Sequence, residues 1–242
     1  MIADGLVSDT KIIVALDYPD LAQTLRMAEQ LDPAKCKVKV GKELFTATGP
    51  FVVRELSRLG FKIFLDLKFH DIPNTAARAC AVAADMGVWM VNVHASGGRA
   101  MLERCVEALV CYGADRPHLI AVTVLTSLDN TELQQIGIDR NVDKQVLLLA
   151  SLAEGCGLNG VVCSAQEARI LRQNVSSSFM LVTPGIRPLL ANKDDQKRTM
   201  TPAEALSLGV NYLVIGRPVT QASHPMGALD KIIEEIKKPF AK

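Results

Sequence analysis

Short runs of apolar residues, rich in β-branched side chains, recur along the chain and alternate with longer segments of mixed polarity. Several of these runs are apolar at nearly every position, which is typical of parallel strands that are covered on both faces. The runs lie at residues 11–17, 36–40, 61–67, 89–93, 119–123, 160–163, 180–182 and 212–215. They predict eight short strands.

The segments between these runs carry helical signals. Residues 20–31 have an amphipathic pattern, and Pro73 stands where the first turn of a helix accepts proline. Helices are expected at residues 20–31, 74–86, 98–112, 143–155, 165–173, 202–208 and 229–238. Because strands and helices alternate with eight strands in all, we predict an α/β fold, a single (β/α)₈ TIM barrel over residues 1–242. A doubly wound open sheet is the alternative, but it usually needs fewer strands at this length.

Length and composition agree with one barrel domain. The chain has 242 residues, of which 49% are apolar and 22% charged, and this excludes a disordered protein. Its 27 Lys and Arg residues nearly balance 26 Asp and Glu residues, so a net charge of +1 gives no support for a nucleic-acid or membrane partner. The apolar stretches are too short for a membrane span, and the first residues lack a secretory signal. We expect a soluble cytoplasmic protein with reduced thiols.

Acids and lysines gather at the ends of the first three expected strands. Asp17 and Lys39 end the first two, and Asp66 and Lys68 end the third. In such barrels the active site lies at the carboxyl ends of the strands. Residues two apart on a strand share a face, so Asp66 and Lys68 should both point into the barrel mouth. A structural ion pair is the alternative, and the presence of Lys39 and Asp17 nearby weakens it.

This cluster decides the chemistry open to Lys68. Burial alone would lower the pKa of the amine and suit it to Schiff-base formation. Neighbouring carboxylates have the opposite effect and keep the group an ammonium. A cationic lysine is a general acid or an electrostatic stabiliser, so the pattern favours a decarboxylase or proton-transfer enzyme over an imine-forming aldolase.

A second group of candidates is basic and glycine-rich. Arg187 follows the seventh expected strand, and Gly216 and Arg217 follow the eighth. Barrels frequently bind phosphate with the loops after these two strands. The polar stretch 183–200 is long for such a loop, which is typical of an active-site lid, and Gln196 on it is a further phosphate candidate. The alternative for Arg217 is a surface arginine in a simple turn.

Other polar residues carry weaker signals. Thr126 and Ser127, after the fifth strand, can hydrogen-bond a heterocycle or form a simple turn. His70 and His94 lack ligand spacing with the carboxylates, so both are interpreted as packing or supporting residues, and no metal site is predicted. The six cysteines show neither a C-x-x-C pair nor zinc spacing and are expected to be small buried residues. Trp89 is expected in the core.

Residues 66–75 read DLKFHDIPNT. This run closely resembles the D-x-K-x-x-D signature of the orotidine 5′-monophosphate decarboxylase family, and in particular its bacterial form. Further matches cover almost the whole chain, at IVALD 13–17, VKVG 38–41, TVLTS 123–127, TPGIR 183–187, DQ 195–196 and IGRP 215–218. No motif position departs from the family pattern.

The resemblance implies decarboxylation of orotidine 5′-monophosphate to uridine 5′-monophosphate, the last step of pyrimidine nucleotide synthesis. It implies that no cofactor is needed. It also implies a homodimer in which Asp71 and Thr75 reach into the partner's active site. The spacing alone says only that Asp71 lies three residues beyond Lys68.

The same resemblance suggests a role for each candidate. Lys68, kept cationic by Asp66 and Asp71, would stabilise a carbanion and then deliver a proton. The remaining residues would bind the substrate: Asp17 and Lys39 at the ribose, Thr126 and Ser127 near the pyrimidine and ribose, and Arg187, Gln196, Gly216 and Arg217 at the phosphate.

Two other functions remain as alternatives. A sugar-phosphate aldolase or epimerase of the same barrel superfamily would use the D-x-K-x-x-D frame around Mg²⁺, although the HDIPNT continuation argues against it. A barrel that binds a phosphate ligand without catalysis is the second alternative.

Overall fold

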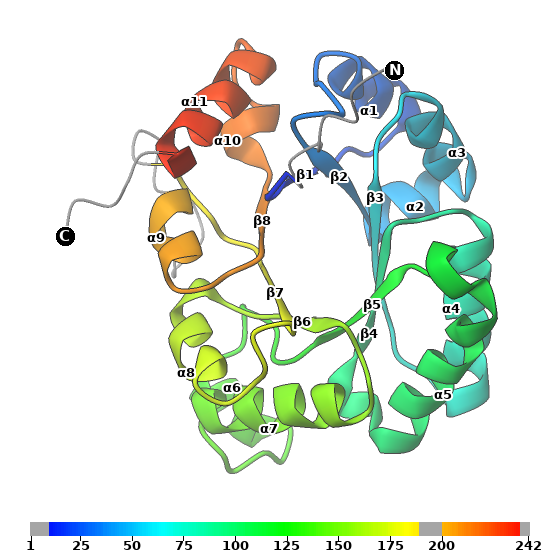
Figure 1. Cartoon of the computed structure of the whole chain (residues 1–242), viewed down its shortest axis with the longest axis vertical. Coiled ribbons are helices and arrows are strands. Elements are labelled where there is room, and N and C mark those ends of the chain that lie inside the picture. Colours follow the sequence, from blue (N-terminus) through cyan, green and yellow to red (C-terminus); the bar gives the residue numbers. More distant parts are fainter. Residues whose placement is uncertain (1–9, 189–199, 238–242) are drawn as a thin grey trace, which may run out of the picture.

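The computed structural model describes residues 10–188 and 200–237 and confirms the predicted (β/α)₈ barrel. Eight parallel strands form one closed ring in chain order, and the helices lie outside it (Figure 1). The ring closes because β1 pairs with both β2 and β8. The strands are β1 (Ile12–Ala15), β2 (Lys37–Gly41), β3 (Ile63–Phe69), β4 (Met90–His94), β5 (His118–Val122), β6 (Gly160–Val162), β7 (Met180–Thr183) and β8 (Tyr212–Ile215).

The helices include every predicted segment and some that the pattern did not predict. The α-helices are α1 (Leu21–Ala28), α2 (Lys42–Thr48), α3 (Phe51–Arg58), α4 (Pro73–Asp85), α5 (Arg99–Leu109), α6 (Asn130–Gln135), α7 (Val142–Gly155), α8 (Ala168–Arg172), α9 (Pro202–Ser207), α10 (Arg217–Thr220) and α11 (Pro225–Lys237). Short 3₁₀ segments are η1 (Ala95–Gly97), η2 (Val110–Asp115) and η3 (Ala165–Glu167).

Four of these helices, α2, α3, α6 and α10, were not expected from the sequence. They are short, with seven residues in α2 and eight in α3. Gly49 and Pro50 separate α2 from α3, and Gly49 has a φ of 59°, which a helix cannot continue through. The interruption hides the helical period that one longer helix would display.

The first strand is shorter than predicted and ends at Ala15 rather than at Asp17. The Leu16 N–H still donates to the Lys39 carbonyl at 3.0 Å, but the ladder ends there. Asp17 therefore lies beyond the strand, at the mouth of the barrel.

Apolar side chains form two layers. The larger one lies between the strands and the surrounding helices. The smaller one fills the ring itself with Ile13, Ala15, Phe64, Met90, Ile120, Val182, Tyr212 and Val214. Full burial of a valine, isoleucine, phenylalanine or methionine side chain contributes about 1.5–3 kcal/mol to the stability of the fold. Because this inner layer fills the ring, the space above it at the carboxyl ends of the strands has an apolar floor.

At the amino ends of the strands, the first residues of β2 and β8, Lys37 and Tyr212, lie beside the indole ring of Trp89. Lys37 begins β2 and is 1% exposed, and its Nζ donates to the Thr10 carbonyl at 2.7 Å. The ammonium also lies 4.8 Å from the ring centroid of Trp89 and 5.0 Å from that of Tyr212. A buried charge requires such partners, and aromatic faces provide them. Trp89, predicted in the core, is only partly buried and packs against the inner layer. The buried lysine was not predicted.

Five of the six cysteines are buried, at positions 36, 80, 105, 156 and 163. The expectation of burial was wrong for Cys111, which is exposed because the 3₁₀ segment η2 lies on the surface. Among the described residues, no helix combines the length and the apolar character that a bilayer crossing requires.

Candidate active site

Strand β3 delivers two charged side chains to the barrel mouth through an irregular stretch of backbone. Its pairing with β4 shifts register between Leu65 and Phe69. Lys68, within this shift, has a φ of 53°, and no other non-glycine residue of the described chain has a positive φ. Such a conformation costs about 1–2 kcal/mol and persists only where the surroundings hold it. The predicted shared face of Asp66 and Lys68 is confirmed, since both line the same pocket.

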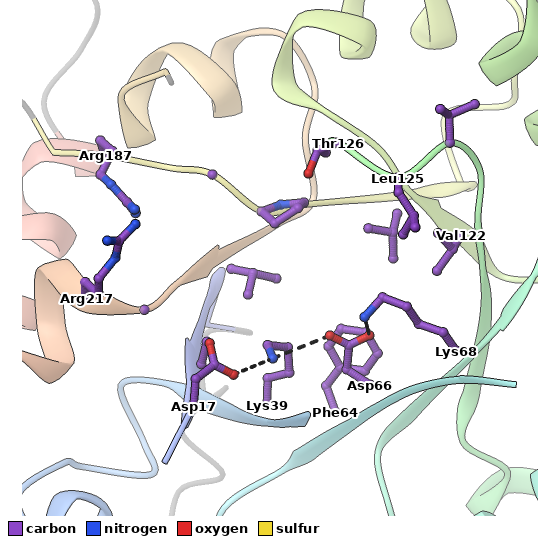
Figure 2. Close-up of a pocket in the computed structure, with 17 residues that line it drawn as sticks. Asp17, Lys39, Phe64, Asp66, Lys68, Val122, Leu125, Thr126, Arg187 and Arg217 are labelled. Atoms are coloured by element: carbon purple, nitrogen blue, oxygen red, sulfur yellow. Dashed lines mark hydrogen bonds and ion pairs between the residues drawn. The ribbon is translucent and has the colours of Figure 1, made fainter. Parts of the chain in front are cut away.

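Four side chains form a row of alternating charge across the first three strands (Figure 2). Asp17 Oδ1 lies 3.0 Å from Lys39 Nζ, which is 3.4 Å from Asp66 Oδ2. The other oxygen of Asp66 accepts from Lys68 Nζ at 2.7 Å. The cluster of acids and lysines expected from the sequence is therefore present in the folded chain, as a row in the order acid, lysine, acid, lysine.

The middle of this row is shielded from water. The side chains of Lys39 and Asp66 are 11% and 12% exposed, whereas that of Asp17 is 62% exposed. Burial acts to lower the pKa of Lys39, but the carboxylates of Asp66 and Asp17 outweigh it and raise that pKa above its usual value. Lys39 is therefore an ammonium at neutral pH.

The row forms one side of a cavity of about 370 Å³, a volume suited to a small organic ligand. Arg187 and Arg217 extend toward each other at a different side of the cavity, away from Lys68 (Figure 2). The remaining lining is Ala15, Phe64, Val122, Val124, Leu125, Thr126, Val162, Pro184, Gly185, Val214 and Gly216. The cavity thus combines an apolar floor, a charged row and a pair of guanidinium groups.

The structure separates the other predicted site residues into three groups. Thr126 lines the cavity, but the adjacent Ser127 is exposed and does not line it. Asp71 and Thr75 are exposed at the start of α4, outside the cavity of their own chain, and the Asp71 carboxylate accepts from the Ile72 N–H at 2.7 Å. Gln196 and most of the expected lid lie outside the described residues.

A protein-family profile matches nearly the whole chain. The profile of the orotidine 5′-phosphate decarboxylase / HUMPS family matches residues 10–232. The chain belongs to this family.

Several relatives that match this chain over nearly their whole length are named orotidine 5′-phosphate decarboxylase. The orotidine 5′-phosphate decarboxylase of Alcanivorax borkumensis is 59% identical over 93% of this chain and 97% of its own, and that of Pseudoalteromonas atlantica is 57% identical over 93% and 98%. Among solved structures, orotidine 5′-phosphate decarboxylase from Lactobacillus acidophilus superposes with a TM-score of 0.85 at 38% identity, covering 95% of this chain and 100% of its own.

In this member of the decarboxylase family, two histidine rings lie close together, and one of them interacts with the charged row. The rings of His70 and His94 lie 5.4 Å apart. Burial, followed by the nearby side chains of His70, Lys42 and Lys68, lowers the pKa of His94 to about 4. Its ring is therefore neutral at pH 7 and adds no charge to the site, which is consistent with a supporting residue.

Asn92 contacts two residues of the site, but the sequence did not predict a role for it. Asn92 lies in the middle of β4 and is fully buried. Its side chain bonds both to the Asp66 carboxylate and to the Lys68 backbone. The sequence feature that could have indicated its role is that Asn92 is the single polar side chain within the apolar run 89–93.

Proposed function

We propose that this chain converts orotidine 5′-monophosphate to uridine 5′-monophosphate and carbon dioxide, with Lys68 as the proton donor. The observation that carries the proposal is the placement of Lys68 in the cavity, 2.7 Å from Asp66, within an alternating charge row. The family membership and the names of the relatives support the same reaction.

The reaction needs a fixed positive charge. When the bond between C6 of the pyrimidine and the carboxylate breaks, carbon dioxide leaves and the electron pair remains on C6. The Lys68 ammonium stabilises that charge and then transfers a proton to C6, after which the neutral amine regains a proton from solvent. Charges that are already in place require little reorganisation during the step. Asp66 and Lys39 hold the array, and Asp71 would extend it across a dimer.

The rest of the substrate would occupy the other parts of the cavity. Arg187 and Arg217, with the Gly216 backbone, would bind the phosphate, because a guanidinium offers a fork of donors to its oxygens. Gln196 would assist them from the loop. The remaining proposed contacts are Asp17 and Lys39 at the ribose, and Thr126 near the pyrimidine and ribose. Ser127, predicted for the same region, is exposed and lies outside the cavity lining, so no contact with the substrate is proposed for it. Binding energy from the phosphate can then be used to lower the barrier at C6.

A second copy of the chain would complete the site. Asp71 and Thr75 lie on the surface at the start of α4, where Ile72 is 67% exposed. Val82 on the same helix is 56% exposed. Exposed apolar side chains of this kind suit an interface, so the proposed homodimer would bury them and bring Asp71 and Thr75 to the partner's cavity.

The direct test is the change in ultraviolet absorbance when the purified chain is mixed with orotidine 5′-monophosphate. Continuous conversion to uridine 5′-monophosphate at catalytic amounts of protein is the expected result. Binding without conversion would favour the non-catalytic barrel instead. The cytoplasmic location expected from the sequence remains part of this proposal.

Chelation should leave the activity unchanged. The carboxylates of Asp17 and Asp66 are already paired with lysines, and these ammonium groups supply the charge that Mg²⁺ would provide in an aldolase-like site. Rates with and without EDTA, after extensive dialysis, should agree within experimental error. Activity that disappears with EDTA and returns with Mg²⁺ would support the metal-dependent alternative.

Removing the guanidinium of Arg217 should harm only substrates that carry a phosphate. For Arg217→Ala we expect kcat/KM for the nucleotide to fall at least a hundredfold, about 2.7 kcal/mol, whereas the slow reaction of the phosphate-free nucleoside should hardly change. Arg104→Ala, which removes an exposed arginine paired with Glu107, is the matched control. Equal losses on both substrates would mean that Arg217 acts on the fold rather than on the phosphate.

A further inference from the structure

Asn92 is tied to both charged residues of β3. It is 0% exposed. Its Nδ2 donates to Asp66 Oδ1 at 2.7 Å, and its Oδ1 accepts from the backbone N–H of Lys68 at 2.8 Å. One rigid amide group therefore connects the side chain of the acid with the main chain of the lysine.

The second of these bonds stabilises an unusual backbone. The pairing of β3 with β4 is interrupted between Leu65 and Phe69, so the Lys68 N–H lies where the regular ladder is broken. Asn92 Oδ1 provides the acceptor there. A buried N–H without an acceptor costs about 1–3 kcal/mol, and Lys68 also has a φ of 53°. The amide thus offsets the cost of the conformation from which the Lys68 side chain extends.

The first bond fixes the carboxylate that Lys68 contacts. Asp66 Oδ1 accepts from Asn92 Nδ2 and from Lys68 Nζ, both at 2.7 Å. The other oxygen, Oδ2, faces Lys39 at 3.4 Å. With donors on both oxygens, the carboxylate has one favourable orientation, and this orientation sets the position of the Lys68 ammonium.

We propose that Asn92 is a positioning residue for the reaction: it holds the Lys68 backbone and the Asp66 carboxylate together, and so determines where the ammonium meets C6. The inference rests on the proposed function. Asn92 does not line the cavity, so it acts through its two partners and not on the substrate. A misplacement of about 1 Å in a reacting group can cost about a hundredfold in rate.

Asn159 provides a matched control from the same chain. Its Oδ1 also accepts a backbone N–H of a neighbouring strand, that of Leu119, at 2.9 Å. Asn159 precedes β6, at the end of the barrel opposite the cavity. Its bond supports the strands without reaching any group of the charged row, so replacing it measures the purely structural cost of losing such a bond.

The test compares Asn92→Ala with Asn159→Ala. Both variants should melt at a lower temperature than the unmodified chain. Only Asn92→Ala should lose kcat, by about a hundredfold, with KM within threefold because the phosphate and ribose contacts are elsewhere. Rates are divided by the number of sites that bind uridine 5′-monophosphate in calorimetry, so a partly unfolded preparation still reports on its folded sites. A kcat for Asn92→Ala within threefold of Asn159→Ala would overturn the inference.

Asn92→Asp allows a second measurement, the pH dependence of kcat, which would stay the same if Asn92 had only a structural role. It has nearly the same shape and keeps the acceptor for the Lys68 N–H, but it places a carboxylate against Asp66. The two acids would share a proton at low pH and repel each other once it is lost, beside Lys39, Lys68 and His94. We expect kcat to fall as the pH rises through neutrality, a limb absent from the unmodified chain. Parallel pH profiles would contradict the proposal, whereas an inactive unmodified chain would refute the proposed function itself.

Discussion

Lys68→Ala should abolish decarboxylation while nucleotide binding persists. The substitution removes the proton donor and the positive charge together, and these two effects are expected to cost more than a thousandfold in kcat, about 4 kcal/mol of barrier. The groups proposed to bind the phosphate and the ribose are untouched. Uridine 5′-monophosphate should therefore still bind, as calorimetry can measure.

Lys35→Ala is the matched control for this experiment. Lys35 also lies 2.7 Å from a carboxylate, that of Asp230, but on the surface near the other end of the barrel. It should keep full activity. If Lys68→Ala retained even a tenth of the normal kcat, which corresponds to about 1.4 kcal/mol of barrier, the role of Lys68 as proton donor would be refuted.

Mixing two inactive variants should restore activity if the active site is shared across a dimer. Consider Lys68→Ala and Asp71→Ala chains that exchange subunits. In a hybrid dimer one site carries both lesions, and the other combines an intact Lys68 with an intact Asp71 from the partner. With equal amounts, about half of the dimers are hybrid, so about a quarter of all sites should regain normal activity. The recovered rate is measured against the two separate variants.

The structure supplies a control for this mixing experiment. Asp66 lies in the same cavity as Lys68 of its own chain, at 2.7 Å. A mixture of Lys68→Ala with Asp66→Ala therefore leaves a lesion in every site and should recover nothing. Labelled chains must first demonstrate that subunits exchange. Given exchange, a Lys68→Ala and Asp71→Ala mixture no more active than its components would rule out the shared site.

The sequence was sufficient to predict the barrel because most of the strands are nearly uninterrupted apolar runs, separated by segments with helical patterns. The eight predicted strands coincide with β1 to β8, with small differences at their ends. The segment between β2 and β3 was harder to interpret, since Gly49 and Pro50 divide it into two short helices. A helix of two turns shows too few periods for its pattern to be recognised.

The candidate site was predictable where position along a strand determines direction. Asp66 and Lys68, two residues apart, line one cavity, as their spacing predicted. The register shift between Leu65 and Phe69 was not predictable, because Lys68 has no sequence feature that favours a positive φ. The proposed role of Asn92 depends on which residue of β4 lies beside that register shift, and only the folded ring determines this. Asp71 is exposed and lies outside the cavity of its own chain, so the role proposed for it requires a second copy.

Trp89 offers a spectroscopic consequence of the barrel's construction. It is the single tryptophan of the chain, and it stands beside the Lys37 ammonium at the amino ends of the strands. The cavity that would take the nucleotide opens at the carboxyl ends. Intrinsic indole emission should therefore stay constant while a ligand titrates into the cavity. It should change when the ring of strands opens and the partly buried indole becomes fully exposed to water, which provides an optical signal for unfolding that is separate from ligand occupancy.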